Sequence, residues 1–335
     1  MQAAIYGLEG FALTVDERDF FRDSEAAGII LFRRNCENQE QLLRLTDSLR
    51  AISGRDDVPI LIDQEGGRVA RMRPPEWPAF PAAEKFANLY RAAPSSAIEA
   101  VRSNARALAL MLRSCGINVN ALPLLDVRQE GATDIIGDRA LGSEPMQVAA
   151  LGRAVLDGMA SAGVVGIIKH MPGHGRALVD SHKELPVVTA SADELESDLE
   201  PFERLASAPM GMTAHVVYTA WDAERPASLS PVVIRDIIRE RIGFDGWLMS
   251  DDLGMEALQG DFASRASGVV AAGCDVALHC SGKMDEMVAV ASAVPPMSPE
   301  GHERLTRAMA STRLDLDRVD FAEEIAKRDQ LLALV

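Results

Sequence analysis

The segment 169–182, KHMPGHGRALVDSH, is the part of the chain richest in side chains that could move protons. Within it, Asp180 and His182 are separated by one residue, and on an extended segment residues i and i+2 project to the same side. A carboxylate beside an imidazole fixes the tautomer of the ring and raises its basicity, so the pair could act as a general acid and base near neutral pH. Four of the six histidines lie in or near this segment, at positions 170, 174, 182 and 215.

Two further features distinguish this segment from an ordinary loop in which a local aspartate merely holds a histidine. Gly173 and Gly175 flank His174, which gives a backbone that can fold tightly or move. Lysine is rarer than histidine in this chain, yet Lys169 directly precedes His170 at the end of a strand-like run. Both features favour a functional interpretation.

Two adjacent acids, Asp251 and Asp252, end another strand-like run. Successive strand residues point to opposite faces, so we expect only one of them to face a site. A buried carboxylate there could be a nucleophile, a base or a metal ligand. The alternative is that both acids cap the following helix and complement its dipole.

A third set of residues has the chemistry of substrate binding. Asp63 ends a strand-like run, Arg71 follows it, and Arg139 lies in the GDRALG segment that follows Asp126. A carboxylate that accepts from hydroxyls, together with guanidinium and ammonium donors such as Lys169, forms a set suited to a polyol or an amide. The alternative is internal ion pairing between neighbouring loops.

Eight short apolar runs alternate with segments of helical period. Most are continuous rather than alternating, which is typical of strands buried on both faces of a parallel sheet. They are 4–8, 28–32, 59–63, 117–122, 164–170, 210–216, 246–251 and 275–280. We expect helices over 38–53, 145–162, 191–207 and 261–272, and another that begins at Ser230-Pro231.

This alternation predicts an α/β fold, a (β/α)8 TIM barrel, in which catalytic residues lie at the C-terminal ends of the strands. We expect a single catalytic domain over 1–335 with a C-terminal helical extension over about 298–335. A doubly wound open sheet is the alternative, but the chain has no GxGxxG turn for a dinucleotide.

The composition indicates a soluble globular protein, with 47% hydrophobic and 25% charged residues. A net charge of −16 disfavours nucleic acid and anionic membranes as partners. The four cysteines show no CxxC spacing, and we expect reduced thiols. The N-terminal segment resembles no signal peptide, and no apolar run approaches the roughly 20 residues of a membrane span. We expect a cytoplasmic monomer without a cofactor.

Four motifs resemble, in order and approximate spacing, those of the glycoside hydrolase family 3 β-N-acetylhexosaminidases, in particular the single-domain NagZ type of bacterial cell-wall recycling. They are IDQEGGRVARMR, GDRALG, KHMPGHGRALVDSHKELP and SDDLGM, and the resemblance spans roughly residues 5–320. The KH-x-PGHG block with its DSH sequence is the most specific of them.

The resemblance implies a retaining enzyme that releases N-acetylglucosamine by double displacement. It assigns Asp251 as the nucleophile and His182 as the general acid/base, assisted by Asp180. It implies a substrate in which GlcNAc is linked to 1,6-anhydro-N-acetylmuramic acid, bare or bearing a peptide. The residues implied to hold the terminal sugar are Asp63, Arg71, Arg139, Lys169 and His170.

Several alternatives stay open. The histidines and an aspartate could bind a metal in a barrel hydrolase, the substrate acetamido group could replace the nucleophile, or phosphate could replace water. A sugar-binding barrel without catalysis is a further alternative. Met171 and Leu141 stand where the family often has bulkier or aromatic residues, so we expect a softer pocket wall.

Overall fold

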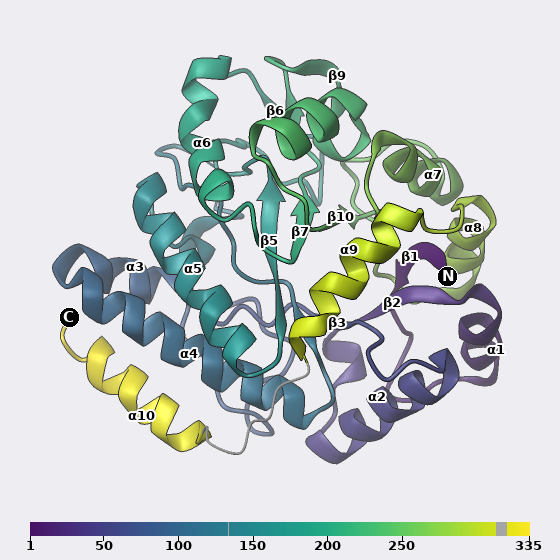
Figure 1. The fold of residues 1–335 in the computed structure, drawn as a ribbon, viewed down its shortest axis with the longest axis horizontal. Helices are drawn as coiled ribbons and strands as arrows, with labels where there is room; N and C mark the ends of the chain where they lie inside the picture. Colours follow the sequence, from purple (N-terminus) through teal and green to yellow (C-terminus); the bar gives the residue numbers. More distant parts are fainter. Residues whose placement is uncertain (133, 313–319) are drawn as a thin grey trace.

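The structure, a computed structural model, describes residues 1–132, 134–312 and 320–335. Eight parallel strands close into a barrel in the order β1-β11-β10-β7-β5-β4-β3-β2, which confirms the predicted (β/α)8 fold (Figure 1). Each predicted strand segment overlaps one of them: β1 (Gln2–Tyr6), β2 (Ala26–Leu31), β3 (Ile60–Ile62), β4 (Val119–Asn120), β5 (Val165–Met171), β7 (Met210–Thr213), β10 (Trp247–Asp252) and β11 (Val276–His279).

The barrel strands are buried because helices cover their outer side and apolar side chains fill the interior. Every residue of β2 and of β5 is buried, as expected for strands without a solvent-exposed face. The pairing register places Ile30 beside Leu61 and Ile168 beside Gly211. The parallel register brings the C-terminal ends of all eight strands to one face of the barrel.

The surrounding helices begin and end at the signals in the sequence. Ser191 and Glu194 form the predicted capping box of α6, and Gly163 and Gly273 adopt positive φ after α5 and α7. The helices are α1 (Val15–Ser24), α2 (Gln39–Ser53), α3 (Ala83–Ala92), α4 (Pro94–Ser114), α5 (Pro145–Ser161), α6 (Ala192–Arg204), α7 (Phe262–Ala272), α8 (Met284–Ala293), α9 (Pro299–Met309) and α10 (Phe321–Leu332).

The helix expected after Ser230-Pro231 is present but has wider turns than an α-helix. Ser230 Oγ accepts from Val233 N at 3.1 Å, as a capping residue should. The following π-helix, η4, spans Val233–Arg241. The apolar spacing of Ile234, Ile237 and Ile238 predicts a helix with one buried face but does not separate these two helix types.

A small second sheet, which we did not predict, lies beside the barrel after β5 and β7. Its order is β6 (Val187–Val188), β8 (Val217–Tyr218) and β9 (Asp222–Pro226). Strands of two residues are too short to produce a recognisable alternation. This sheet fixes the end of the segment 172–186, so it anchors the loop that carries Asp180 and His182.

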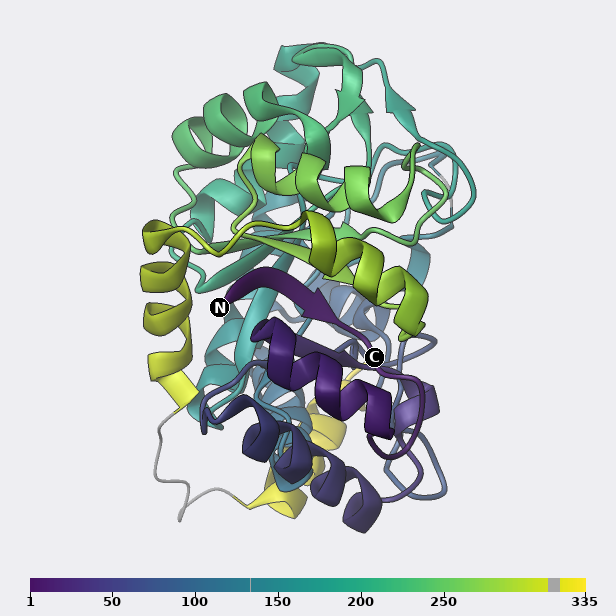
Figure 2. The same ribbon diagram turned by 90° about the vertical axis from the view of Figure 1, so that its right-hand side faces the viewer.

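The C-terminal helices pack on different parts of the barrel, and both views separate α9 from α10 (Figures 1 and 2). Arg304 on α9 pairs with Asp275 at 3.0 Å, beside β11. Glu324 on α10 pairs with Arg106 of α4 at 2.7 Å. Among the described helices, none combines the length and the apolar character that crossing a membrane requires.

Candidate active site

The polar residues singled out in the sequence gather around one cavity of about 340 Å³ at the C-terminal ends of the strands. Its floor is apolar and is formed by Ile30, Met212 and Leu278, which belong to the barrel core. Its walls include seven of the eight predicted site residues: Asp63, Arg71, Arg139, Lys169, His170, His182 and Asp251. The eighth, Asp180, hydrogen-bonds His182 at the rim.

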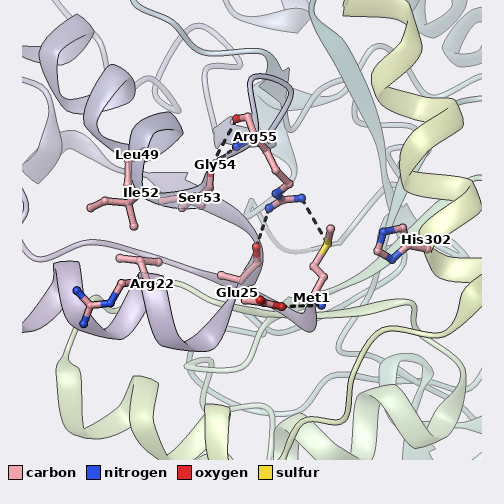
Figure 3. Close-up of a pocket in the computed structure, with 12 residues that line it drawn as sticks. Met1, Arg22, Glu25, Leu49, Ile52, Ser53, Gly54, Arg55 and His302 are labelled. Carbon is pink, nitrogen blue, oxygen red and sulfur yellow. Dashed lines mark hydrogen bonds and ion pairs between the residues drawn. The ribbon is translucent and has the colours of Figure 1, made fainter.

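A second cavity, of about 430 Å³, lies at the opposite end of the barrel, next to the residues that precede β2 and β3 (Figure 3). There Arg55 donates to the carbonyl oxygens of Ala26 at 2.7 Å and of Ala27 at 3.2 Å, and His302 of α9 faces the cavity. The N-terminal face of such a barrel serves stability rather than chemistry. The smaller cavity is therefore the candidate active site.

Asp63 is the centre of a buried charge cluster on one wall of this cavity. Its carboxylate accepts from Lys169 Nζ at 3.1 Å and from Arg71 Nη2 at 3.2 Å. Burial alone would raise the pKa of Asp63, but the two cations outweigh it and hold that pKa well below its usual range. Asp63 is thus a carboxylate at any working pH, with both oxygens placed at the cavity.

Glu65 is a functional residue that we missed. Its carboxylate binds Arg139 in bidentate fashion at 2.8 and 2.9 Å and contacts Lys169 Nζ at 2.7 Å. Burial acts to raise the pKa of Glu65, but Lys169 and Arg139 lower it overall. The signal for it was present, since Glu65 lies two residues from Asp63 and so projects to the same side of an extended segment.

The intervening residue, Gln64, fixes the local geometry of both acids. Its side-chain carbonyl accepts from the backbone N–H of Arg71 at 2.8 Å and of Met72 at 3.0 Å. Its backbone N–H donates to Asn120 Oδ1 of β4 at 3.0 Å. Because Gln64 is fully buried, it turns Asp63 and Glu65 toward the cavity.

Phe32, which follows β2, supports Arg71. The guanidinium of Arg71 lies over the Phe32 ring, 5.1 Å from its centroid, and Arg34 lies 4.9 Å from the same centroid. Stacking on an aromatic face holds a guanidinium plane without using its donors. Arg71 Nε is buried and has no hydrogen-bond partner within the part of the chain that the structure describes.

Replacing Glu65 with alanine is expected to destabilise the fold by about 3–5 kcal/mol, because Arg139 and Lys169 would stay buried without their shared carboxylate. Urea unfolding of the purified variant measures the effect. Glu40→Ala, which removes a partner of Arg44 on the exposed face of α2, is the control and should change stability only slightly. Equal losses in the free energy of unfolding for the two substitutions would contradict the conclusion that the buried cluster contributes more to stability than an exposed ion pair.

The lowered pKa of Asp63 predicts how stability depends on pH. Because the folded pKa lies below the unfolded value of about 3.9, the stabilisation is present above that pH and is lost as pH falls through the folded pKa. At pH 5 the wild type should exceed Asp63→Asn in free energy of unfolding. The gap should narrow by up to about 1.4 kcal/mol for each unit below pH 4. Denaturant titrations from pH 5 to pH 3 measure it, and a gap independent of pH would contradict the argument.

Asp126 organises the two histidines at the end of β5. One carboxylate oxygen bonds His170 Nδ1 at 2.8 Å, and the other accepts from the backbone N–H of His170 at 3.1 Å and of His174 at 2.7 Å. Burial opposes the charged form, but His170 and His174 hold the pKa of Asp126 below its usual range. Asp126 therefore fixes the His170 ring, whose other nitrogen is directed away from this bond.

Asp251 and Asp252 differ in environment. Asp251 Oδ1 accepts from Asp252 N at 2.8 Å, while Oδ2 has no hydrogen-bond partner in the described part of the chain. Burial acts to raise the pKa of Asp251, but His170 and His215 lower it overall. Asp252 Oδ1 instead accepts from the backbone N–H groups of Gly254 at 2.9 Å and Cys280 at 3.1 Å. Both acids line the cavity, and among the described residues neither Oδ2 has a hydrogen-bond partner, but Oδ1 of Asp252 is held by two backbone N–H groups and Oδ1 of Asp251 by one.

His182 lies at the mouth of the cavity with 62% of its side chain exposed. Asp180 Oδ1 accepts from His182 N and also bonds Nδ1 of the ring, both at 2.9 Å. The contact between residues i and i+2 is the one expected from the sequence, but the backbone is a turn rather than the expected extended segment, since Lys183 N donates to the carbonyl oxygen of Asp180 at 2.9 Å. Burial slightly opposes the charged form of Asp180, yet its bonds to His182 lower its pKa. Nε2 is left as the nitrogen that can exchange a proton with a ligand.

The sequence left two possibilities open for Gly175, and the expectation for Met171 and Leu141 was wrong. Gly175 is required by close packing, since a Cβ there would lie 1.9 Å from the carbonyl oxygen of Val127, so it is a contact point rather than a hinge in this structure. Met171 and Leu141 are buried in the core and do not line the cavity. They therefore do not form the pocket wall.

All four cysteines are free thiols, and Cys36 is only partly buried.

Within residues 1–132, 134–312 and 320–335, no three His, Cys, Asp or Glu side chains are grouped so as to hold a metal ion. Each of the three histidines considered as ligands has a ring nitrogen bonded to a protein group: His170 to Asp126, His174 to Ser181 and His182 to Asp180.

Known proteins match the chain over most of its length. Residues 5–310 match the glycosyl hydrolase family 3 N-terminal domain. A beta-hexosaminidase of Bordetella avium is 36% identical over 328 residues, which cover 96% of this chain and 93% of that protein. The crystal structure of native NagZ from Neisseria gonorrhoeae is similar with a TM-score of 0.88 and 32% identity, covering 99% of this chain and 98% of that one.

The Neisseria protein was also solved with N-trifluoroacetyl-D-glucosamine, and that structure matches with a TM-score of 0.86. The agreement in fold and in sequence therefore extends over nearly the whole chain. The resemblance inferred from the four motifs is confirmed. The chain belongs to glycosyl hydrolase family 3 and is a glycoside hydrolase.

Proposed function

We propose that the protein is a retaining exo-β-N-acetylglucosaminidase that removes a terminal, non-reducing GlcNAc by double displacement. Asp251 is the nucleophile, His182 is the general acid and base, and Asp180 orients His182. The observation that carries the proposal is the placement at one cavity of the Asp251 carboxylate, whose pKa is lowered by His170 and His215, and of an imidazole bound by a second carboxylate.

In the first step, Asp251 Oδ2 attacks the anomeric carbon while the bond from that carbon to the leaving oxygen breaks. A carboxylate of lowered pKa is ionised and ready for this attack. The Asp252 N–H holds Oδ1 and so aims the group. The product is an α-linked glycosyl ester, and a second displacement by water restores the β configuration and frees Asp251.

His182 supplies the protons for both steps. Its Nε2 donates a proton to the leaving oxygen in the first step and takes one from the attacking water in the second. The contact from Asp180 to Nδ1 stabilises the ring while it carries the proton. Unlike a second carboxylate, an imidazole does not place another anion beside Asp251, and this supports its use opposite a buried nucleophile.

The charged wall supports binding of a hydroxylated ring. Asp63 would accept from sugar hydroxyls, while Arg71 and Lys169 keep it ionised and donate to the same ring. His170, fixed by Asp126, would contact the sugar next to Asp251. Arg139 donates to Glu65 through Nε and Nη2, so it would act through its remaining N–H groups and, because Glu65 also contacts Lys169, through the position of Lys169.

The shape of the cavity supports action at a chain end. Its apolar floor is the core of the barrel, so a sugar enters from one side only. The complex of the Neisseria protein with a GlcNAc analogue supports GlcNAc as the terminal sugar. For the leaving part we propose 1,6-anhydro-N-acetylmuramic acid, with or without its peptide, as in peptidoglycan recycling.

Product analysis by NMR tests this function. With a β-GlcNAc glycoside of anhydromuramic acid, we expect GlcNAc to appear first as the β-anomer, in phosphate buffer as in phosphate-free buffer and after prolonged EDTA treatment. An initial α-anomer would contradict retention, and GlcNAc-1-phosphate would identify a phosphorylase. Loss of activity in EDTA would support a metal-dependent hydrolase, and binding without turnover would indicate a sugar-binding protein.

A further inference from the structure

Ser181 stands out within the DSH sequence because it is the buried member of an exposed group. Only 3% of Ser181 is accessible, whereas the side chains of Asp180 and His182 are 25% and 62% exposed. The backbone turns here, with the N–H of Lys183 donating to the carbonyl oxygen of Asp180 at 2.9 Å, and Ser181 faces the protein interior while His182 faces solvent. Its hydroxyl bonds His174 Nε2 at 3.1 Å.

His174 is a rigid support for that hydroxyl. Its backbone N–H donates to Asp126 at 2.7 Å, and the carbonyl oxygen of the preceding Gly173 accepts from Tyr218 OH at 2.7 Å. The next residue, Gly175, packs against the Val127 backbone. Burial, reinforced by the neighbouring His170, lowers the pKa of His174 to about 4, so its ring is neutral near pH 7 and bonds a hydroxyl without introducing charge.

Ser181 is also connected to the strand that carries the nucleophile. Its carbonyl oxygen accepts from the backbone N–H of Ala257 at 3.3 Å, in the loop that follows β10 and Asp251. Between His174 and Ser181 the loop reaches the protein surface, where Leu178 is exposed. The two bonds of Ser181 therefore connect this end of the loop to the segments that follow β5 and β10.

We propose that His174 and Ser181 form a positioning pair, in which the imidazole fixes Ser181 and thereby holds the Asp180–His182 dyad over the cavity. Neither residue touches the reacting atoms. The inference rests on the proposed role of His182 and adds the element that aims it. It explains why a fully buried histidine without a catalytic contact lies beside the site.

The expected signature of the pair is selective loss of acid catalysis. Without the Ser181 hydroxyl, His182 would be displaced from the leaving oxygen, and a displacement of about 1 Å can cost about 100-fold in rate. Leaving groups that depart as stable anions need little help from an acid. Ser181→Ala should therefore lower kcat/KM for a phenyl β-GlcNAc glycoside by about 10–100-fold, but change that for the 2,4-dinitrophenyl glycoside by less than about threefold.

The experiment compares Ser181→Ala, His174→Gln, His182→Ala and the Ser181→Ala/His182→Ala double variant across a series of aryl β-GlcNAc glycosides. His174→Gln keeps a polar group within reach of Ser181 and should lose less than Ser181→Ala. The double variant should match His182→Ala, because a positioning residue has no effect once the group it positions is gone. Thr46→Val is the control. It removes a buried hydroxyl of α2 that donates to the Cys115 carbonyl oxygen and does not line the cavity, so the variant should keep wild-type kinetics.

The outcomes separate this inference from the proposed function. A steep dependence on the leaving group in His182→Ala, with none in Ser181→Ala or His174→Gln, would overturn the positioning pair alone. Equal losses for all leaving groups in Ser181→Ala would indicate a purely structural hydroxyl and would also overturn it. If His182→Ala itself shows no dependence on the leaving group, the acid/base assignment fails.

Discussion

Asp251→Ala is expected to lower kcat for an aryl β-GlcNAc glycoside by about 10⁴-fold or more, because the enzyme then has no group to form the glycosyl ester. The loss should appear in kcat as well as in kcat/KM, since the carboxylate acts on the reacting carbon. Thermal unfolding should show a folded variant, because Oδ1 makes one backbone bond and Oδ2 makes none in the described residues.

Azide provides the control for this prediction. A small anion can enter the space left by the carboxylate and attack the anomeric carbon directly, so Asp251→Ala in azide should regain activity and release the α-glycosyl azide. Activity within about tenfold of wild type without azide would contradict the assignment. So would rescue that yields the β-azide.

His182→Ala has the second-largest expected effect. For substrates with poor leaving groups, kcat/KM should fall by about 10²- to 10⁴-fold, the range of general acid catalysis, and it should change little for the 2,4-dinitrophenyl glycoside. With that activated substrate the second step becomes slow because water lacks its base. Rapid-mixing experiments should therefore show a burst of dinitrophenol equal to the enzyme concentration.

The stereochemistry of azide rescue distinguishes this variant from the previous one. Azide attacks the glycosyl ester on Asp251 in His182→Ala, so the product should be the β-azide, opposite to that from Asp251→Ala. His302→Ala removes an exposed histidine at the far cavity and serves as the matched control with wild-type kinetics. A uniform loss across all leaving groups in His182→Ala would contradict its role as acid.

The barrel could be predicted because its evidence is local. Continuous apolar runs such as 28–32 and 164–170 identify strands, and the Ser191 capping box marks a helix start within the chain itself. Asp180 and His182 are also a local pair, so their contact could be predicted from their separation of two residues, although a turn rather than an extended backbone brings them together.

The rest of the site depends on partners that are distant in sequence. Glu65 meets Arg139 across 74 residues, and nothing in the EGGRV segment specifies which cation it will bind. Ser181 meets His174 only because the loop between them folds back. The glycine at 175 allowed either a tight contact or a hinge, and only the approach of Val127 decides between them.

The most direct test of the account is to trap the intermediate with a 5-fluoro derivative of N-acetylglucosaminyl fluoride, which forms the glycosyl ester faster than water removes it. Mass spectrometry of the intact protein and of its peptides should show one added sugar, on the peptide that contains Asp251, and none in Asp251→Ala. An adduct on another residue, or continued turnover of the reagent with no adduct, would contradict the assignment of Asp251 as the nucleophile.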